Sequence, residues 1–167
     1  MTADWPDMDS TGVTVTDEDV RALEDRIGTT LPDEYRAFLL DVNGGKPGAR
    51  HRVLTLVNEQ VVLRDLHSLS SSGAPFDIVT RMERLRVQVP YPLIPIGSAG
   101  GASHTGAICL CVEGPERGTI WYSVLGGAPR AHNFQHWSQR PDVQLLAENF
   151  GAFVASLGPL GIARYAN

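Results

Sequence analysis

The sequence contains only two cysteines, Cys109 and Cys111, and a single residue separates them. A disulfide framework joins distant parts of a chain, so this pair does not indicate one, and reduced thiols are expected. No apolar run approaches the roughly 18 residues that span a bilayer. The N-terminus carries acids where a secretory signal carries lysine or arginine. We therefore expect a cytoplasmic protein that does not associate with a membrane.

The composition is typical of a folded globular domain. Of the 167 residues, 43% are hydrophobic and 20% are charged. A chain of this length buries about 70% of its unfolded surface as one domain, so it needs no metal or disulfide to fold. The predicted organisation is a flexible N-terminal arm at residues 1–14, one domain at residues 15–160 and a C-terminal tail at residues 161–167.

The charge is distributed unevenly along the chain. Residues 1–45 hold 11 acidic residues and 3 arginines, whereas residues 46–167 hold 8 acidic and 11 basic residues. An acidic front disfavours nucleic acid and favours a basic protein partner, because complementary fields speed encounter. The alternative is that these acids only keep an exposed helical face soluble. The acids that we predict to contact a partner are Asp17, Glu18, Asp25, Asp33, Glu34 and Asp41.

Two short helices are predicted near the N-terminus. The first begins at Thr16, which forms a capping arrangement with Asp19, and it ends at Gly28. The second begins at Pro32 as its first helical residue and ends at Asn43–Gly45, because asparagine and glycine adopt the left-handed conformation. Each helix has one apolar face, formed by Val20, Leu23 and Ile27 in the first and by Tyr35, Phe38, Leu39 and Val42 in the second.

Strands are predicted over most of the remaining chain. Two lie within Arg52–Leu66, and three more are expected at Leu93–Ile96, Ala107–Val112 and Thr119–Val124. Helices are expected at Phe76–Gln88 and from Leu145 through Phe153, which Gly158 and Pro159 close. The predicted fold class is α+β, a single domain with a mostly antiparallel sheet of about five or six strands flanked by N-terminal and C-terminal helices.

Two enzyme-like patterns occur in the glycine-rich segment Gly97–Gly106. A phosphate-binding loop needs a helix after it and usually a lysine, but the segment that follows reads as a strand, which favours a hairpin loop. Ser103 lies in a near match to the G-x-S-x-G turn of serine hydrolases, but Thr105 replaces the second glycine. A polar loop is the simpler interpretation, and no catalytic set is expected.

Three further side-chain groups suggest alternative sites. A zinc site could combine Cys109 and Cys111 with His132 and His136, but a one-residue spacer is short for such sites, and buried thiols are favoured instead. Strand alternation puts Trp121 and Tyr122 on opposite faces, so one should face outward, and Trp121 is added to the predicted partner surface. The arginines Arg81, Arg84 and Arg86 lack interleaved aromatics and indicate a solvated face, not a nucleic-acid site. No cofactor is expected.

The order of these segments resembles the SUKH superfamily, named partly for yeast cell-wall assembly regulators. The matching features are Leu-Glu at 23–24, Leu-Pro at 31–32, Tyr35, Phe-Leu at 38–39 and Asn-Gly-Gly at 43–45. LIPIGSAGG, RGTIWYSV and LAENFGAFVASL are similar to later family segments, and the resemblance runs from about Val20 to Leu157. Ser103 and His104 depart from the acidic or Asn residue that often follows the family's glycine loop.

The resemblance implies a binding protein and not an enzyme. Bacterial members of this superfamily are best known as immunity proteins, each of which neutralises a cognate toxin, frequently a nuclease, by covering or distorting its active site. The expected partner is therefore a cognate protein toxin. The alternative that the resemblance leaves open is a regulatory or scaffolding module that binds a housekeeping protein.

Overall fold

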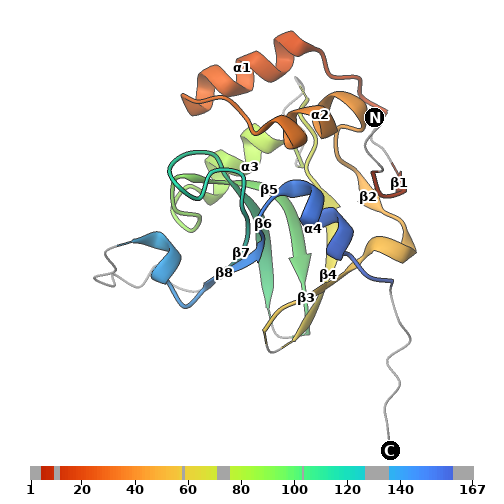
Figure 1. Ribbon diagram of the computed structural model, residues 1–167, viewed down its shortest axis with the longest axis vertical. Coiled ribbons are helices and arrows are strands. Elements are labelled where there is room, and N and C mark those ends of the chain that lie inside the picture. The colour runs from red at the N-terminus through yellow and green to blue at the C-terminus, as the bar shows by residue number, and fades with distance from the viewer. Residues whose placement is uncertain are drawn as a thin grey trace, which may run out of the picture.

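One six-stranded antiparallel sheet organises the computed structural model, which describes residues 5–9, 12–57, 59–70, 76–102, 104–126 and 136–159 (Figure 1). Its strand order is β3-β4-β5-β6-β7-β8, with bounds Val53–Thr55, Gln60–Leu66, Leu93–Gly100, Thr105–Cys111, Ile120–Leu125 and Val143–Ala147. Strands β1 (Met8–Asp9) and β2 (Lys46–Pro47) pair in a separate ribbon. The helices of the described residues are α1 (Asp17–Ile27), α2 (Asp33–Asp41), α3 (Ile78–Leu85) and α4 (Phe150–Ser156), with 3-10 turns η1 (Ala49–His51) and η2 (Trp137–Gln139). The predicted α+β single domain is confirmed.

Helix α1 has both of the ends that its sequence predicts. The Asp19 amide donates to the Thr16 hydroxyl (3.2 Å), and the Thr16 amide donates to the Asp19 carboxylate (2.8 Å). Hydrogen bonds from the Thr16 amide and the Thr16 hydroxyl hold the pKa of the Asp19 carboxyl below its ordinary value. Gly28 ends the helix at φ 78°. Among the described residues, no helix has the length and apolar character needed to cross a bilayer.

The Asn43-Gly44-Gly45 segment connects α2 to the sheet. Asn43 is buried, and its side-chain amide donates to the carbonyls of Val13 and Leu69 (both 3.0 Å) while its oxygen accepts from the Leu69 amide (2.7 Å). Gly45 exchanges two backbone hydrogen bonds with Leu66 of β4 (both 2.9 Å). The segment therefore ends α2 as predicted and also positions the helix against β4.

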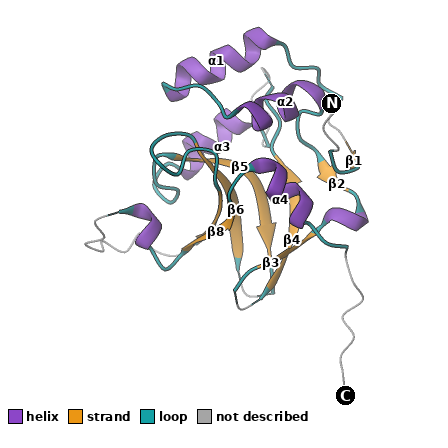
Figure 2. Cartoon of the chain, viewed as in Figure 1, coloured by secondary structure: helices purple, strands orange, loops and turns teal. Residues whose placement is uncertain are grey.

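Apolar side chains cover both faces of the sheet. On β6, Ile108 and Leu110 point into the main cluster, which contains the apolar faces of α1, α2 and α4. Cys109 and Cys111 point the other way, into a second cluster with Trp121 and Val143. Figure 2 shows α1 and α2 beyond one end of the strands and α4 across them. The sheet thus has two buried faces, which the strand alternation alone does not reveal.

Two predicted helices are shorter in the structure. Leu145–Ala147, predicted as helix, belongs to β8, which pairs with β7, and α4 starts only at Phe150 with Asn149 as its N-cap. Helix α3 spans Ile78–Leu85, within the predicted Phe76–Gln88. Asp77 caps it by accepting from the Thr80 amide (3.0 Å). Pro32 lies one residue before α2 instead of at its first position.

Candidate protein-binding surface

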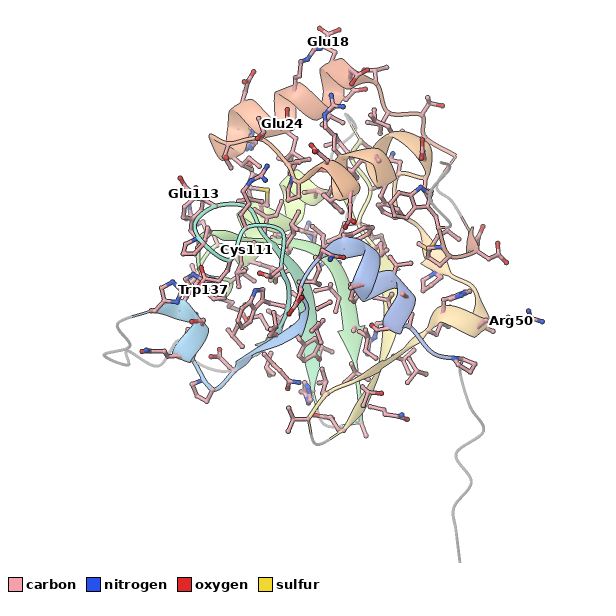
Figure 3. All side chains as sticks on the ribbon, viewed as in Figure 1. Glu18, Glu24, Arg50, Cys111, Glu113 and Trp137 are labelled. Carbon is pink, nitrogen blue, oxygen red and sulfur yellow. The ribbon has the colours of Figure 1, made fainter. Side chains whose placement is uncertain are left out.

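The six predicted acids lie on the two N-terminal helices, and all are exposed. Asp17, Glu18 and Asp25 are on α1, and Asp33, Glu34 and Asp41 are on α2. Figure 3 shows Glu18 at the outer side of α1, pointing away from the rest of the molecule. The apolar faces of both helices pack inward, so their remaining faces leave these carboxylates accessible to a partner.

Three of these acids, Asp17, Glu34 and Asp41, also hold parts of the fold together. Arg36 Nη2 lies 2.5 Å from Asp17 Oδ1, which joins α2 to α1. Glu34 Oε2 accepts from the Gly151 amide at the start of α4 (3.0 Å). Exposed contacts of this kind add little stability, roughly 0–1 kcal/mol. Within the described ranges, Glu18, Asp25 and Asp33 have no ion-pair or hydrogen-bond partner.

A groove of about 730 Å³ lies between α2, α4, η1 and the N-terminal segment. Asp33 and Glu34 of α2 form its acidic side. Its apolar lining includes Val154 and Leu157 of the last helical segment. Both residues are buried, at 7% and 6% exposure, so they contribute the floor of the groove. The groove combines an apolar floor with two adjacent carboxylates.

Trp5 forms the N-terminal wall of this groove. Its ring packs edge-on against Phe38 (5.4 Å between centroids) and against Phe150 (5.9 Å). Its indole Nε1–H donates to Asp41 Oδ2 (3.1 Å). Trp5 therefore docks on the body of the domain, and the contact brings Asp41 close to the groove.

Trp121 is buried, so the prediction that either Trp121 or Tyr122 faces outward was wrong. The side chain is only 8% exposed and packs edge-to-face on Trp137 at 4.7 Å, while its Nε1–H donates to the Thr119 hydroxyl (2.7 Å). Tyr122 on the opposite face is buried as well. The prediction assumed that one face of the sheet meets solvent, but η2 and the second cluster cover that face.

Three of the four proposed zinc ligands are described, and they form no metal-binding group. Cys109 and Cys111 do share one face of β6, but they lie in the second apolar cluster, where burial raises the pKa of both thiols and disfavours the thiolate that zinc requires. His136 bonds to Ser138 (2.6 Å), and His132 lies outside the described residues. The part of the chain that the structure describes contains no grouping of three or more His, Cys, Asp or Glu side chains that could hold a metal ion.

The glycine-rich segment is a hairpin, as predicted. Gly97 and Gly100 belong to β5 and Gly106 belongs to β6. The two strands pair directly, so a strand instead of a helix follows the turn. Ser103, the residue of the hydrolase-like pattern, lies outside the described residues. The hairpin contributes Ser98 to a different polar network, with Asp65 and His67 of the neighbouring β4 segment.

In this network Asp65 stands between the other two side chains. Its carboxylate accepts from the Ser98 hydroxyl and lies 3.0 Å from His67 Nδ1. A hydrolytic triad has the opposite order, with histidine next to the serine that it activates. Burial disfavours the charged form of Asp65, but hydrogen bonds from His67 and Ser98 outweigh burial and hold the pKa of its carboxyl below the ordinary value. The arrangement stabilises the β4–β5 pairing.

This network predicts a specific pH dependence. Because the pKa of Asp65 is lower in the folded state than in the unfolded state, its stabilising effect is present above the ordinary carboxyl pKa and is lost as pH falls through the folded value. Asp65→Asn should therefore be less stable than the parent at about pH 6, and the difference should shrink toward about pH 3. Urea unfolding at both pH values measures this, and a constant difference would contradict the assignment.

Comparison with known proteins identifies the family. No curated protein matches the chain. The model of the SMI1/KNR4 family (SUKH-1) matches residues 14–156, a range that contains α1, α2, α3, α4 and the whole six-stranded sheet. Because this match covers most of the chain together with the elements that build its core, the protein belongs to the SMI1/KNR4 family (SUKH-1).

Proposed function

We propose that this chain is a cytoplasmic immunity protein that binds a cognate protein toxin and inhibits it through the surface formed by α1, α2 and α4. Membership of a binding-type, non-catalytic family supports a role in protein binding. The observation that carries the proposal is the groove itself, where Asp33 and Glu34 stand beside the apolar residues Val154 and Leu157. Protein interfaces commonly combine such an apolar centre with a charged rim.

The groove specifies the chemistry of the segment that would occupy it. An apolar side chain of the toxin would lie against Val154 and Leu157, and a neighbouring lysine or arginine would meet Asp33 and Glu34. Glu18 and Asp25 on α1 extend the negative surface beyond the groove. Such a field accelerates encounter with a positively charged partner. A nuclease toxin would present that charge in the cleft that normally holds its polyanionic substrate.

The direct test is co-expression with any toxin candidate encoded beside this gene, scored as recovery of growth. Recovery supports the proposal. If growth does not recover although the toxin candidate is active and this protein is folded, the proposal is overturned. That result would favour the alternative of a regulatory or scaffolding module. The affinity of the purified complex should also fall as salt rises, because exposed charge pairs are screened. Affinity that changes little between low and high salt would argue against mimicry of a polyanion.

Reversing one groove charge should weaken the complex strongly. Asp33→Lys places a cation where the toxin would present one, so we expect the Kd to rise about tenfold or more. The change costs α2 less than about 1 kcal/mol at its N-terminus, so the fold should persist. Glu113→Lys is the matched control, since Glu113 is exposed on the turn after β6 and Figure 3 shows it away from α4. Equal effects of the two variants on Kd would exclude the groove as the contact.

A further inference from the structure

A second pocket, of about 510 Å³, lies apart from the groove and has the opposite charge character. Strands β4, β5 and β6, the ribbon strand β2 and helix α3 contribute to its wall. Its cations are Lys46 of β2, Arg64 of β4 and Arg81 of α3. These residues are far apart in the sequence, so the fold brings their charges to one cavity. No part of the proposed toxin groove shares a lining residue with this pocket.

Two acids, Asp9 and Asp65, line the pocket with its three cations, so the lining keeps one net positive charge. The Asp65 carboxylate accepts from Ser98 and lies beside His67, and the charge of Arg81 helps to hold its pKa below the ordinary value. Within the described ranges, neither Lys46 nor Arg81 forms an ion pair with an acidic side chain. In a protein whose net charge is −5, this net positive lining favours an anionic group.

Arg81 has an unfilled hydrogen-bonding position. Its guanidinium stacks over the ring of Phe76 at 5.2 Å, which restrains the orientation of the cation. Its Nε is buried and has no acceptor among the described residues. A buried donor without an acceptor costs roughly 1–3 kcal/mol. A guanidinium is also suited to a carboxylate, which it can bind through two parallel hydrogen bonds.

Apolar side chains beside the cations indicate what carries this carboxylate. Phe76 and Leu125 line the same pocket, and Phe76 is an exposed large hydrophobic residue at 53% exposure. A free inorganic anion or a phosphate backbone would leave these side chains without contacts. A peptide that bears an acidic residue next to an apolar one satisfies both parts of the pocket. Its volume, about 510 Å³, is within the range of sites that hold small ligands and short peptide anchors.

We propose that this pocket binds an acidic peptide segment of a protein partner. Arg81 and Lys46 hold an aspartate or glutamate side chain of the segment, and Phe76 and Leu125 contact its apolar neighbour. The inference goes beyond the toxin groove and does not depend on it. The protein would therefore recognise a basic surface with α1, α2 and α4 and an acidic segment with this pocket.

Selection from a library of displayed random heptapeptides against the intact protein tests the proposal. We expect the enriched sequences to carry Asp or Glu beside an apolar residue, and the Kd of the best peptide to rise at least tenfold in Arg81→Gln. Lys46→Gln is a second variant that should weaken binding. Lys46 is exposed, so this variant still tests the pocket if Arg81→Gln harms folding by removing the contact with Phe76. Arg84→Gln is the matched control, because Arg84 lies on the same helix, is exposed and does not line the pocket.

Chemical labelling locates the bound peptide. Lys46 is the only lysine of the chain, so acetylation of side-chain amines reports on this position alone. The selected peptide should protect Lys46, with the N-terminal amine as the internal reference. The proposal is overturned if the selection shows no preference for acids, if Arg81→Gln and Lys46→Gln bind as the parent does, or if Lys46 stays fully reactive. Tighter binding of a single-stranded oligonucleotide at Lys46 would overturn it in favour of a nucleic-acid site.

Discussion

Replacing Phe38 by alanine is expected to lower the free energy of unfolding by about 3–5 kcal/mol, a large part of the total stability of a domain. Phe38 is fully buried, and its ring lies 4.9 Å from that of Phe150 and 5.4 Å from that of Trp5. The substitution removes the contact on which α2, α4 and the N-terminal segment converge. Surrounding side chains come from different elements, so they cannot all move in to fill the cavity.

Urea unfolding followed by circular dichroism measures this loss. Val57→Ala is the control, because Val57 is 78% exposed and its truncation should change the free energy by less than about 0.5 kcal/mol. A loss below about 1 kcal/mol in Phe38→Ala would show that the aromatic cluster is not central to the core. A large loss would also explain any effect of this substitution on toxin binding, since the same cluster supports the groove.

Gly44→Ala should be the most damaging glycine substitution at the ends of the N-terminal helices. Gly44 has φ +75°, and an added Cβ would lie 2.6 Å from the backbone carbonyl oxygens of Leu66 and His67. These oxygens are main-chain atoms of the last residue of β4 and of the residue after it, so they cannot rotate away as a side chain would. The backbone connection between α2 and the sheet must shift, at a cost of about 1–3 kcal/mol beyond that of the left-handed conformation itself.

Gly28→Ala separates the cost of the left-handed conformation from the cost of the steric clash. Gly28 has nearly the same conformation, φ +78°, but no atom lies within 4 Å of an added Cβ. We expect Gly28→Ala to lose only about 1–2 kcal/mol, the cost of the left-handed conformation for a residue with a side chain. Thermal and urea unfolding of both variants gives the difference. Equal losses would mean that the carbonyls of Leu66 and His67 do not restrict Gly44.

Local signals made the N-terminal helices predictable from the sequence. Caps such as Thr16 and stops such as Gly28 act through neighbouring residues, and the structure confirms both. Strand β8 was missed because Leu145, Leu146 and Phe150 keep a spacing that resembles a helix, while the actual conformation of the leucines depends on pairing with β7. Asn149, which caps α4 by accepting from the Ala152 amide (2.7 Å), was the sequence signal that marks the boundary.

The candidate site was predictable only in part for a similar reason. Exposure of the acids follows from the apolar faces of α1 and α2, which a helical pattern reveals. The contact of Glu34 with Gly151 joins residues 117 positions apart, and the groove exists only because of that approach. The position of Trp121 was mispredicted because it depends on Trp137, which comes from a separate 3-10 turn. Contacts between distant segments decide these features, and they leave no local pattern.

The three tryptophans lie in two separate parts of the protein, so their spectroscopic signals report on different regions. Trp5 stands at the groove beside Asp41, whereas Trp121 and Trp137 form a close pair in the second cluster. Indole emission responds to the polarity around the ring, and the coupled pair should give a distinct near-ultraviolet dichroism signal. Emission from Trp5 can therefore report the arrival of a partner while the pair reports whether the far side of the sheet remains intact. The chain carries its own reporter for each apolar cluster, and neither requires an attached dye.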